Sequence, residues 1–134
     1  MMEQHAGRTI LVIDDEVNAR KLAKMLLERE GFTVFTAGNG EEGLTLAKVE
    51  RPDVILLDLI MPKMSGHEVL QRLKQDPDTR AISIIVLTAK VADRDIATSF
   101  RLGAAFHLEK PYEVKDLIQK IYAALALGRQ EGSV

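Results

Sequence analysis

Five short apolar runs alternate with segments of helical periodicity along this chain, and this alternation restricts the fold more than any other feature. Each run has the length of a strand, and its nearly continuous Ile, Val and Leu content is typical of strands covered on both faces. The runs cover about residues 8–13, 32–37, 53–57, 82–87 and 105–108. Because parallel strands need helical crossovers, five strand–helix repeats predict an open parallel sheet with helices on both faces.

Helices between the runs are indicated by apolar residues at helical spacing. These sets are Ala19, Leu22, Ala23 and Leu26; Val69, Leu70 and Leu73; Ala92, Ile96 and Phe100; and Val114, Leu117, Ile118, Ile121, Tyr122 and Leu125. Propensity predicts a further helix over 39–50, with Asn39 as its N-cap. Gly31 and Gly128 stand where glycines end helices. The chain therefore divides into a tail (1–7), one domain (8–127) and a second tail (128–134).

Composition narrows the classes of function. At 134 residues with 46% hydrophobic content, the chain is one domain with a sizeable core. Its formal net charge of −2 and the absence of a basic stripe argue against direct binding to nucleic acid. The absence of cysteine excludes disulfides, thiolate catalysis and cysteine-ligated zinc. There is no signal-peptide core and no apolar run of membrane-spanning length, so we expect a cytoplasmic protein without membrane insertion.

Reactive polar residues follow four of the apolar runs. Asp14 and Asp15 end the first run, Asp58 the third and Thr88 the fourth, and Lys110 comes just after the fifth. Ligands of open parallel sheets bind beyond the carboxyl ends of the strands, so these side chains should meet at one edge. Carboxylates suit Mg²⁺, and an aspartate can carry a phosphoryl group. The pattern predicts a site for a divalent cation and a phosphoryl group.

Simpler structural roles exist for the same residues. The two aspartates at 14 and 15 could cap the helix that follows, and Thr88 could be only a β-branched residue at a strand end. Lys110 precedes Pro111, and we predict that this peptide bond is cis. The stretch 38–43 fits the dinucleotide-binding pattern G-x-G-x-x-G, but its two glutamates would repel a pyrophosphate, so we interpret it as a capped turn.

Taken together, these motifs resemble the receiver domain of bacterial two-component response regulators over about residues 8–127. The matching pieces are Ile13-Asp14-Asp15-Glu16, Leu57-Asp58-Leu59-Ile60-Met61-Pro62, Ser65-Gly66, Leu87-Thr88-Ala89 and Lys110-Pro111. The resemblance implies a flavodoxin-like (CheY-like) doubly wound sheet of five parallel strands, in the order 2-1-3-4-5, with five flanking helices.

The resemblance also implies a function. Asp58 would accept a phosphoryl group from a sensor histidine kinase or a histidine phosphotransfer protein, and Thr88 and Lys110 would contact that group. Mg²⁺, or Mn²⁺ in its place, would be held by Asp14, Asp15, Asp58 and the backbone carbonyl of Ile60. Phosphorylation would then change the face formed by the fourth helix, fifth strand and fifth helix, about 91–127, which would contact a downstream protein or a second copy of the chain. The protein would be a phosphoacceptor rather than an enzyme with an external substrate.

Three positions depart from the usual family pattern. His107 stands where a switch aromatic is common, and it could titrate near neutral pH. Ile60 and Lys90 occupy the positions that tune access of water to the aspartyl phosphate. An apolar Ile60 offers water no hydrogen bond, so we predict slow self-dephosphorylation.

Other classes remain as alternatives. The chain could be a stand-alone regulator, a receiver fragment of a larger regulator or of a hybrid histidine kinase, or a pseudo-receiver used as a binding scaffold. An aspartyl-phosphate hydrolase would need an acidic residue at Ile60, and a flavin-binding protein would need more aromatic residues than the 4% present.

Overall fold

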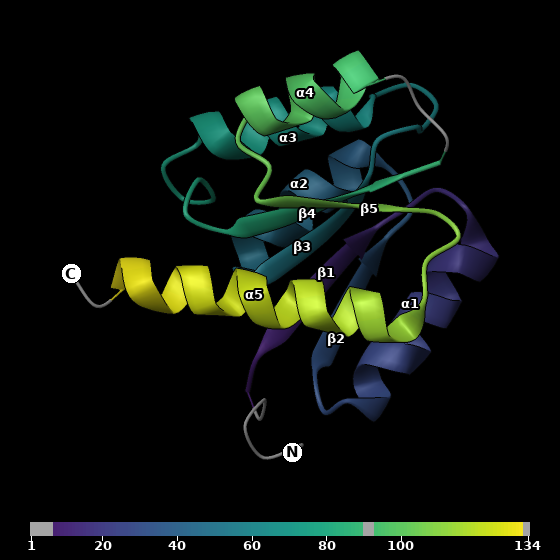
Figure 1. Cartoon of the computed structure of the whole chain (residues 1–134). Helices are drawn as coiled ribbons and strands as arrows, with labels where there is room; N and C mark the ends of the chain where they lie inside the picture. The colour runs from purple at the N-terminus through teal and green to yellow at the C-terminus, as the bar shows by residue number, and fades with distance from the viewer. Residues whose placement is uncertain (1–6, 90–92, 133–134) are drawn as a thin grey trace.

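The computed structural model describes residues 7–89 and 93–132, in which strands and helices alternate (Figure 1). The strands are β1 (Thr9–Ile13), β2 (Thr33–Ala37), β3 (Val54–Asp58), β4 (Ser83–Thr88) and β5 (Phe106–Glu109). The helices are α1 (Val17–Arg29), α2 (Gly40–Glu50), α3 (Gly66–Gln75), α4 (Asp93–Arg101) and α5 (Val114–Gly132). Each predicted strand is present, and no strand end differs from the prediction by more than one residue.

All strands pair in parallel, in the order β2-β1-β3-β4-β5, which confirms the predicted doubly wound topology. The strand order reverses at β1, where β2 lies on one side and β3 on the other. The carboxyl ends of β1 and β3 are therefore neighbours, and Ile13 is paired with Leu57. This pairing brings Asp14 and Asp58, the next residues of the two strands, to the same edge of the sheet.

Alternate residues of the central strands build two separate core layers. Ile10 and Val12 face the layer shared with α1 and α5, whereas Leu11 and Ile13 face the layer shared with α2 and α3. Figure 1 shows α5 and α1 on one face of the sheet and α2 and α3 on the other. Because both faces are covered, the strands are apolar throughout, as the sequence pattern indicated.

The structure corrects two details of the predicted helices. Leu22 is 49% exposed, and Leu27 occupies the core position instead. The last helix does not end at Gly128 but continues to Gly132. A single helical glycine costs only about 1 kcal/mol, which the surrounding helix formers tolerate. Ala92, predicted as part of the fourth helix, lies outside the described residues.

The observed helix caps agree with the sequence predictions better than those two details do. The Asn39 side chain accepts a hydrogen bond from the amide of Glu42, as predicted for an N-cap. Gly31 follows α1 with φ +98°, the left-handed conformation of a helix-ending glycine. The cap of α1 is Glu16, whose carboxylate accepts from the amides of Asn18 and Ala19. Neither preceding aspartate is therefore needed as the N-cap.

Gly66 determines how α3 starts against the end of β3. A Cβ atom at this position would lie 2.4 Å from the carbonyl oxygen of Asp58 and 2.5 Å from the Cα of Leu59. The Gly66 amide also donates a 3.0 Å hydrogen bond to the Leu59 carbonyl. Only a residue without a side chain allows this approach, which positions Asp58 relative to the loop that follows it.

We expect Gly66→Ala to lower the free energy of unfolding by about 2 kcal/mol or more, since the new methyl group meets backbone atoms. Gly40→Ala is the comparison variant, because its Cβ would meet side-chain atoms of Val69 and Met64, which can shift more easily than the backbone. Urea unfolding should show the larger loss for Gly66→Ala. An equal loss in both variants would contradict this account of the close approach.

In the part of the chain that the structure describes, no helix has the length and apolar composition needed to cross a membrane.

Candidate functional site

Three aspartates meet at the carboxyl edge of the sheet. Asp14, Asp15 and Asp58 each offer a carboxylate oxygen, and these oxygens lie within 4.8 Å of one another. Asp14 and Asp58 are buried, with 1% and 6% of their surface exposed, whereas Asp15 is exposed. The acidic cluster therefore has a buried floor and one open side.

Lys110 bridges the two buried carboxylates. Its Nζ lies 2.7 Å from Oδ2 of Asp14 and 3.3 Å from Oδ2 of Asp58. The lysine follows β5 directly, and its backbone amide donates to the carbonyl oxygen of Thr88. The Lys110–Pro111 peptide bond is cis, as the sequence predicted. The ammonium of Lys110, just after β5, thus joins carboxylates at the carboxyl ends of β1 and β3.

Backbone amides orient the other oxygens of the same carboxylates. The Glu16 amide donates to Oδ1 of Asp14, and the Ile60 amide donates to Oδ1 of Asp58, each at 3.0 Å. In both cases the donor lies two residues after the aspartate, in the loop that leaves the strand. Each buried carboxylate therefore has one oxygen held by its own loop and the other by Lys110.

Burial and charge act in opposite directions on Asp58. Burial raises the pKa of its carboxyl above the usual 3.8, and the charge of Asp14 adds to that effect. The Ile60 amide and Lys110 offset part of the increase because they stabilise the ionised form. For Lys110, burial opposes the charge, but the hydrogen bond to Asp14 and the charges of both aspartates outweigh it and raise the pKa of the ammonium.

The chemistry of this cluster fits a hard divalent cation. Three carboxylates face one ammonium, so the ionised site carries a net charge of about −2 within a few ångströms. All the candidate ligands are oxygens, which Mg²⁺ prefers, and the exposed side leaves room for water. Asp14, Asp15 and Asp58 are thus the residues that would hold the ion.

The other predicted site residues lie at different places around this cluster. Thr88 ends β4 and is 1% exposed, in the strand paired with β3. The Ile60 side chain is 56% exposed just beyond Asp58. His107 is half-buried in β5, and its ring contacts Phe100 of α4 edge-on, with 5.6 Å between the ring centroids. Lys90 lies outside the described residues.

The glycine-rich stretch after β2 serves packing. A Cβ at Gly43 would lie 2.5 Å from the Ile13 side chain, and a Cβ at Gly40 would meet Met64. These glycines let α2 lie close to the sheet and to the loop before α3. The stretch is therefore the capped turn that the sequence analysis favoured.

Sequence reasoning missed one residue near the cluster. Arg20 reaches back from α1, and its Nη1 donates a 2.8 Å hydrogen bond to the carbonyl oxygen of Asp14. An arginine one and a half turns after the strand-end aspartates was the available signal, but arginine on an amphipathic helix is usually a solvated residue.

Known proteins with similar sequences place this chain in a family. Residues 10–122 match the model of the response regulator receiver domain. Protein PilH of Pseudomonas aeruginosa is 37% identical over 117 residues, which cover 87% of this chain and 97% of PilH. The probable transcriptional regulator ycf27 of Guillardia theta is 42% identical over 118 residues, which cover 87% of this chain but 44% of the regulator. The chain thus spans less than half the length of that relative.

A solved structure agrees with the sequence matches. Chemotaxis protein CheY4 of Vibrio cholerae superimposes with a TM-score of 0.85 at 28% identity, covering 90% of this chain and 100% of CheY4. The doubly wound sheet, which carries the acidic edge in this chain, is the architecture that it shares with that solved structure. The chain belongs to the response regulator receiver domains of two-component signalling.

We expect Asp58→Asn to stabilise the folded protein at pH 7 in metal-free buffer. The Asp58 pKa is raised in the folded state, so the wild-type protein loses stability as pH rises through that pKa. Asparagine removes the buried charge, and Lys110 keeps its contact with Asp14. Urea unfolding should therefore give a higher midpoint for the variant at pH 7, with a smaller difference at acidic pH, where the wild-type carboxyl gains a proton.

The surface variant Asp78→Asn is the control and should show no comparable gain. A lower midpoint for Asp58→Asn at both pH values would contradict the assignment of an unfavourable buried charge.

Proposed function

We propose that this receiver domain accepts a phosphoryl group on Asp58 in a reaction that requires Mg²⁺. The observation that supports the proposal most strongly is the arrangement of Lys110 between the two buried carboxylates. Asp58 has one oxygen bound to a backbone amide and the other beside an ammonium. That environment suits an oxygen that will bond to phosphorus while nearby positive charge offsets the new negative charge.

The proposed transfer has a simple balance of bonds. An oxygen of ionised Asp58 attacks the phosphorus of a phosphohistidine, so an O–P bond forms and the P–N bond breaks. The electron pair of the broken bond goes to the histidine nitrogen of the donor. Bound Mg²⁺ would supply additional positive charge to the phosphoryl oxygens. Lys110 stays protonated and pairs with the phosphoryl oxygens, and the Thr88 hydroxyl donates a hydrogen bond to one of them.

We propose that Mg²⁺ is held by Asp14, Asp15 and Asp58, with the Ile60 carbonyl as a further ligand. Mn²⁺ is a reasonable substitute because it takes the same oxygen ligands. The support from the structure is the oxygen-only cluster and its excess negative charge.

For signal output we propose the face formed by α4, β5 and α5. His107 links two of these elements through its contact with Phe100, and His67 of α3 lies 3.1 Å, through its Nε2, from the carbonyl oxygen of Asp95 in α4. A phosphoryl group at Asp58 would favour an inward position of Thr88 and change the packing of His107. Such a local charge that biases a two-state element is a common form of regulation.

The partners follow from this role. Receiver domains interact with histidine kinases and downstream effectors, and we propose that a sensor histidine kinase or a histidine phosphotransfer protein is the phosphoryl donor. A downstream protein or a second copy of the chain would bind the output face. The pseudo-receiver scaffold is less favoured because every residue needed for phosphoryl transfer is present.

Phosphorylation of Asp58 can be tested directly with acetyl phosphate and Mg²⁺. We expect the intact mass of the wild-type protein to increase by one phosphoryl group, and the gain to disappear when EDTA removes the metal. Asp58→Ala should not gain the group, whereas the surface variant Asp78→Ala should behave like wild type. A wild-type protein that never gains the group would overturn the proposal.

Ile60 provides a test of phosphoryl lifetime. Its exposed side chain lies beside Asp58 and offers attacking water no hydrogen bond, whereas asparagine would. We expect Ile60→Asn to shorten the lifetime by up to about ten-fold, or about 1.4 kcal/mol of barrier. Ile60→Val should keep the wild-type lifetime, measured as loss of the phosphoryl mass with time. An unchanged or longer lifetime in Ile60→Asn would count against this role.

A further inference from the structure

Arg20 contacts the backbone of the acidic cluster rather than its carboxylates. The Arg20 side chain is half-buried, and its Nη1 donates to the Asp14 carbonyl oxygen at 2.8 Å. β1 ends at Ile13, so this carbonyl lies beyond the strand itself. The guanidinium therefore provides a partner for a backbone oxygen at the point where the chain leaves the sheet.

The Asp14 carbonyl belongs to the peptide plane that joins Asp14 to Asp15. The hydrogen bond from Arg20 fixes the direction of the carbonyl, while the Asp14 amide donates to Ala37 of β2 at 3.1 Å. Asp15 is exposed, and its nitrogen belongs to this peptide plane, so holding the plane limits where its Cα–Cβ bond can point. Holding that plane therefore directs the Asp15 carboxylate toward the other two.

A second neighbour, Gly38, restricts where the guanidinium can lie. The space beside Gly38, in the turn after β2, is filled by Arg20: a Cβ at Gly38 would lie 3.1 Å from Nη1 and 3.5 Å from Cζ. The arginine is thus placed between the β1–α1 loop and the β2–α2 turn. Such close packing preserves one orientation of a side chain that would otherwise move freely.

We propose that Arg20 is a positioning residue that sets the affinity of the acidic cluster for its divalent cation. Residues that orient metal ligands typically change metal affinity by about 10- to 100-fold when they are removed. The inference rests on the proposed function, since it concerns the ion that would be held by Asp14, Asp15 and Asp58.

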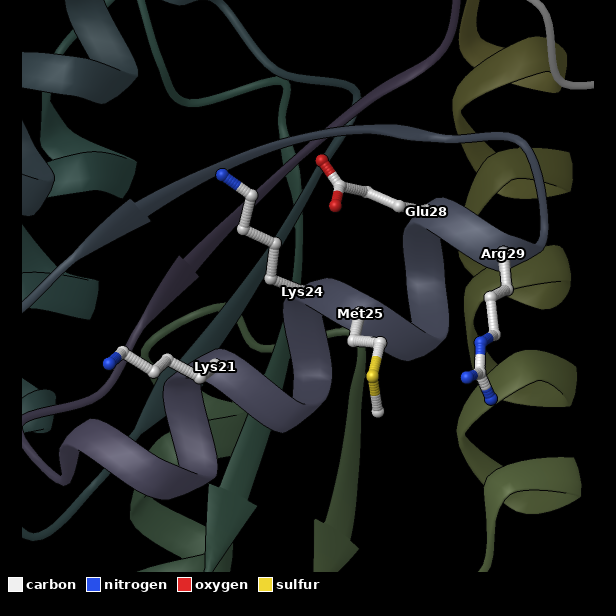
Figure 2. A pocket seen from close by; sticks show the side chains of 5 residues that line it. All are labelled: Lys21, Lys24, Met25, Glu28 and Arg29. Carbon is white, nitrogen blue, oxygen red and sulfur yellow. The ribbon is translucent and has the colours of Figure 1, made fainter.

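The test is a calorimetric titration of the protein with Mn²⁺. We expect Arg20→Met to raise the Kd about ten-fold, as for other ligand-orienting residues. Arg20→Lys, which keeps a donor and a charge, should recover part of the affinity. Lys24→Met is the matched control, because it removes one positive charge from the same helix without contact to the cluster. Figure 2 shows Lys24 and Lys21 among the residues that line a pocket on the outer face of α1.

A double-mutant cycle tests whether Gly38, in the turn after β2, affects metal binding through Arg20. Gly38→Ala should weaken Mn²⁺ binding modestly in the wild-type background, since its methyl group would crowd Nη1 and shift the guanidinium by a few tenths of an ångström. In the Arg20→Met background the same change should have little further effect, because the displaced group is gone. Additive losses would overturn the proposed contact.

A kinetic measurement separates positioning from general damage. The rate of phosphorylation by acetyl phosphate in Arg20→Met should be low at limiting Mg²⁺ and should return toward the wild-type rate at saturating Mg²⁺. Urea unfolding reports whether the variant is folded. Equal Mn²⁺ affinity in Arg20→Met and Lys24→Met would overturn the inference while leaving phosphorylation of Asp58 intact. A wild-type protein that neither binds Mn²⁺ nor gains a phosphoryl group would overturn the proposed function itself.

Discussion

The arrangement of the site depends on one buried ion-pair bridge, in which the Lys110 ammonium lies between Asp14 and Asp58. Two carboxylates taken out of water repel each other, and each is expensive to bury alone. The Lys110 ammonium, which follows β5, reduces the cost of burying both carboxylates. It can reach both of them only if β1, β3 and β5 end at the same level of the sheet. The parallel register of β1, β3, β4 and β5 meets that requirement, so the sheet and the site constrain each other.

The bridge leaves the cluster incompletely neutralised, and this imbalance connects stability to function. Burial and Asp14 raise the pKa of Asp58, so its charge is tolerated rather than favoured in the folded protein. A divalent cation would relieve this strain between like charges, and a phosphoryl group would then place new negative charge beside the same ammonium. The charge of this site would thus change when it binds a cation or a phosphoryl group, which agrees with membership of the receiver family.

The sequence determined the parallel sheet and its helices because the signals for these elements are local. Near-continuous apolar strands such as Val54 to Leu57 can only be covered on both faces, and helices between them can only make parallel crossovers. The polar residue after each strand then had to lie at one edge. The sequence alone therefore predicted one site that contains Asp14, Asp58, Thr88 and Lys110. The roles of His107 and Ile60 came from family resemblance instead.

The tertiary structure decided what depends on contacts between distant segments. Leu22 fits the helical stripe as well as Leu27 does, and only the direction in which α1 packs against the sheet places Leu27 in the core. Gly128 looks like a helix end, but the helix continues through it. Arg20 resembles any solvated arginine until folding brings it to the Asp14 carbonyl and Gly38. Periodicity fixes which residues share a face, but the partner of a long flexible side chain is settled only when the two segments meet.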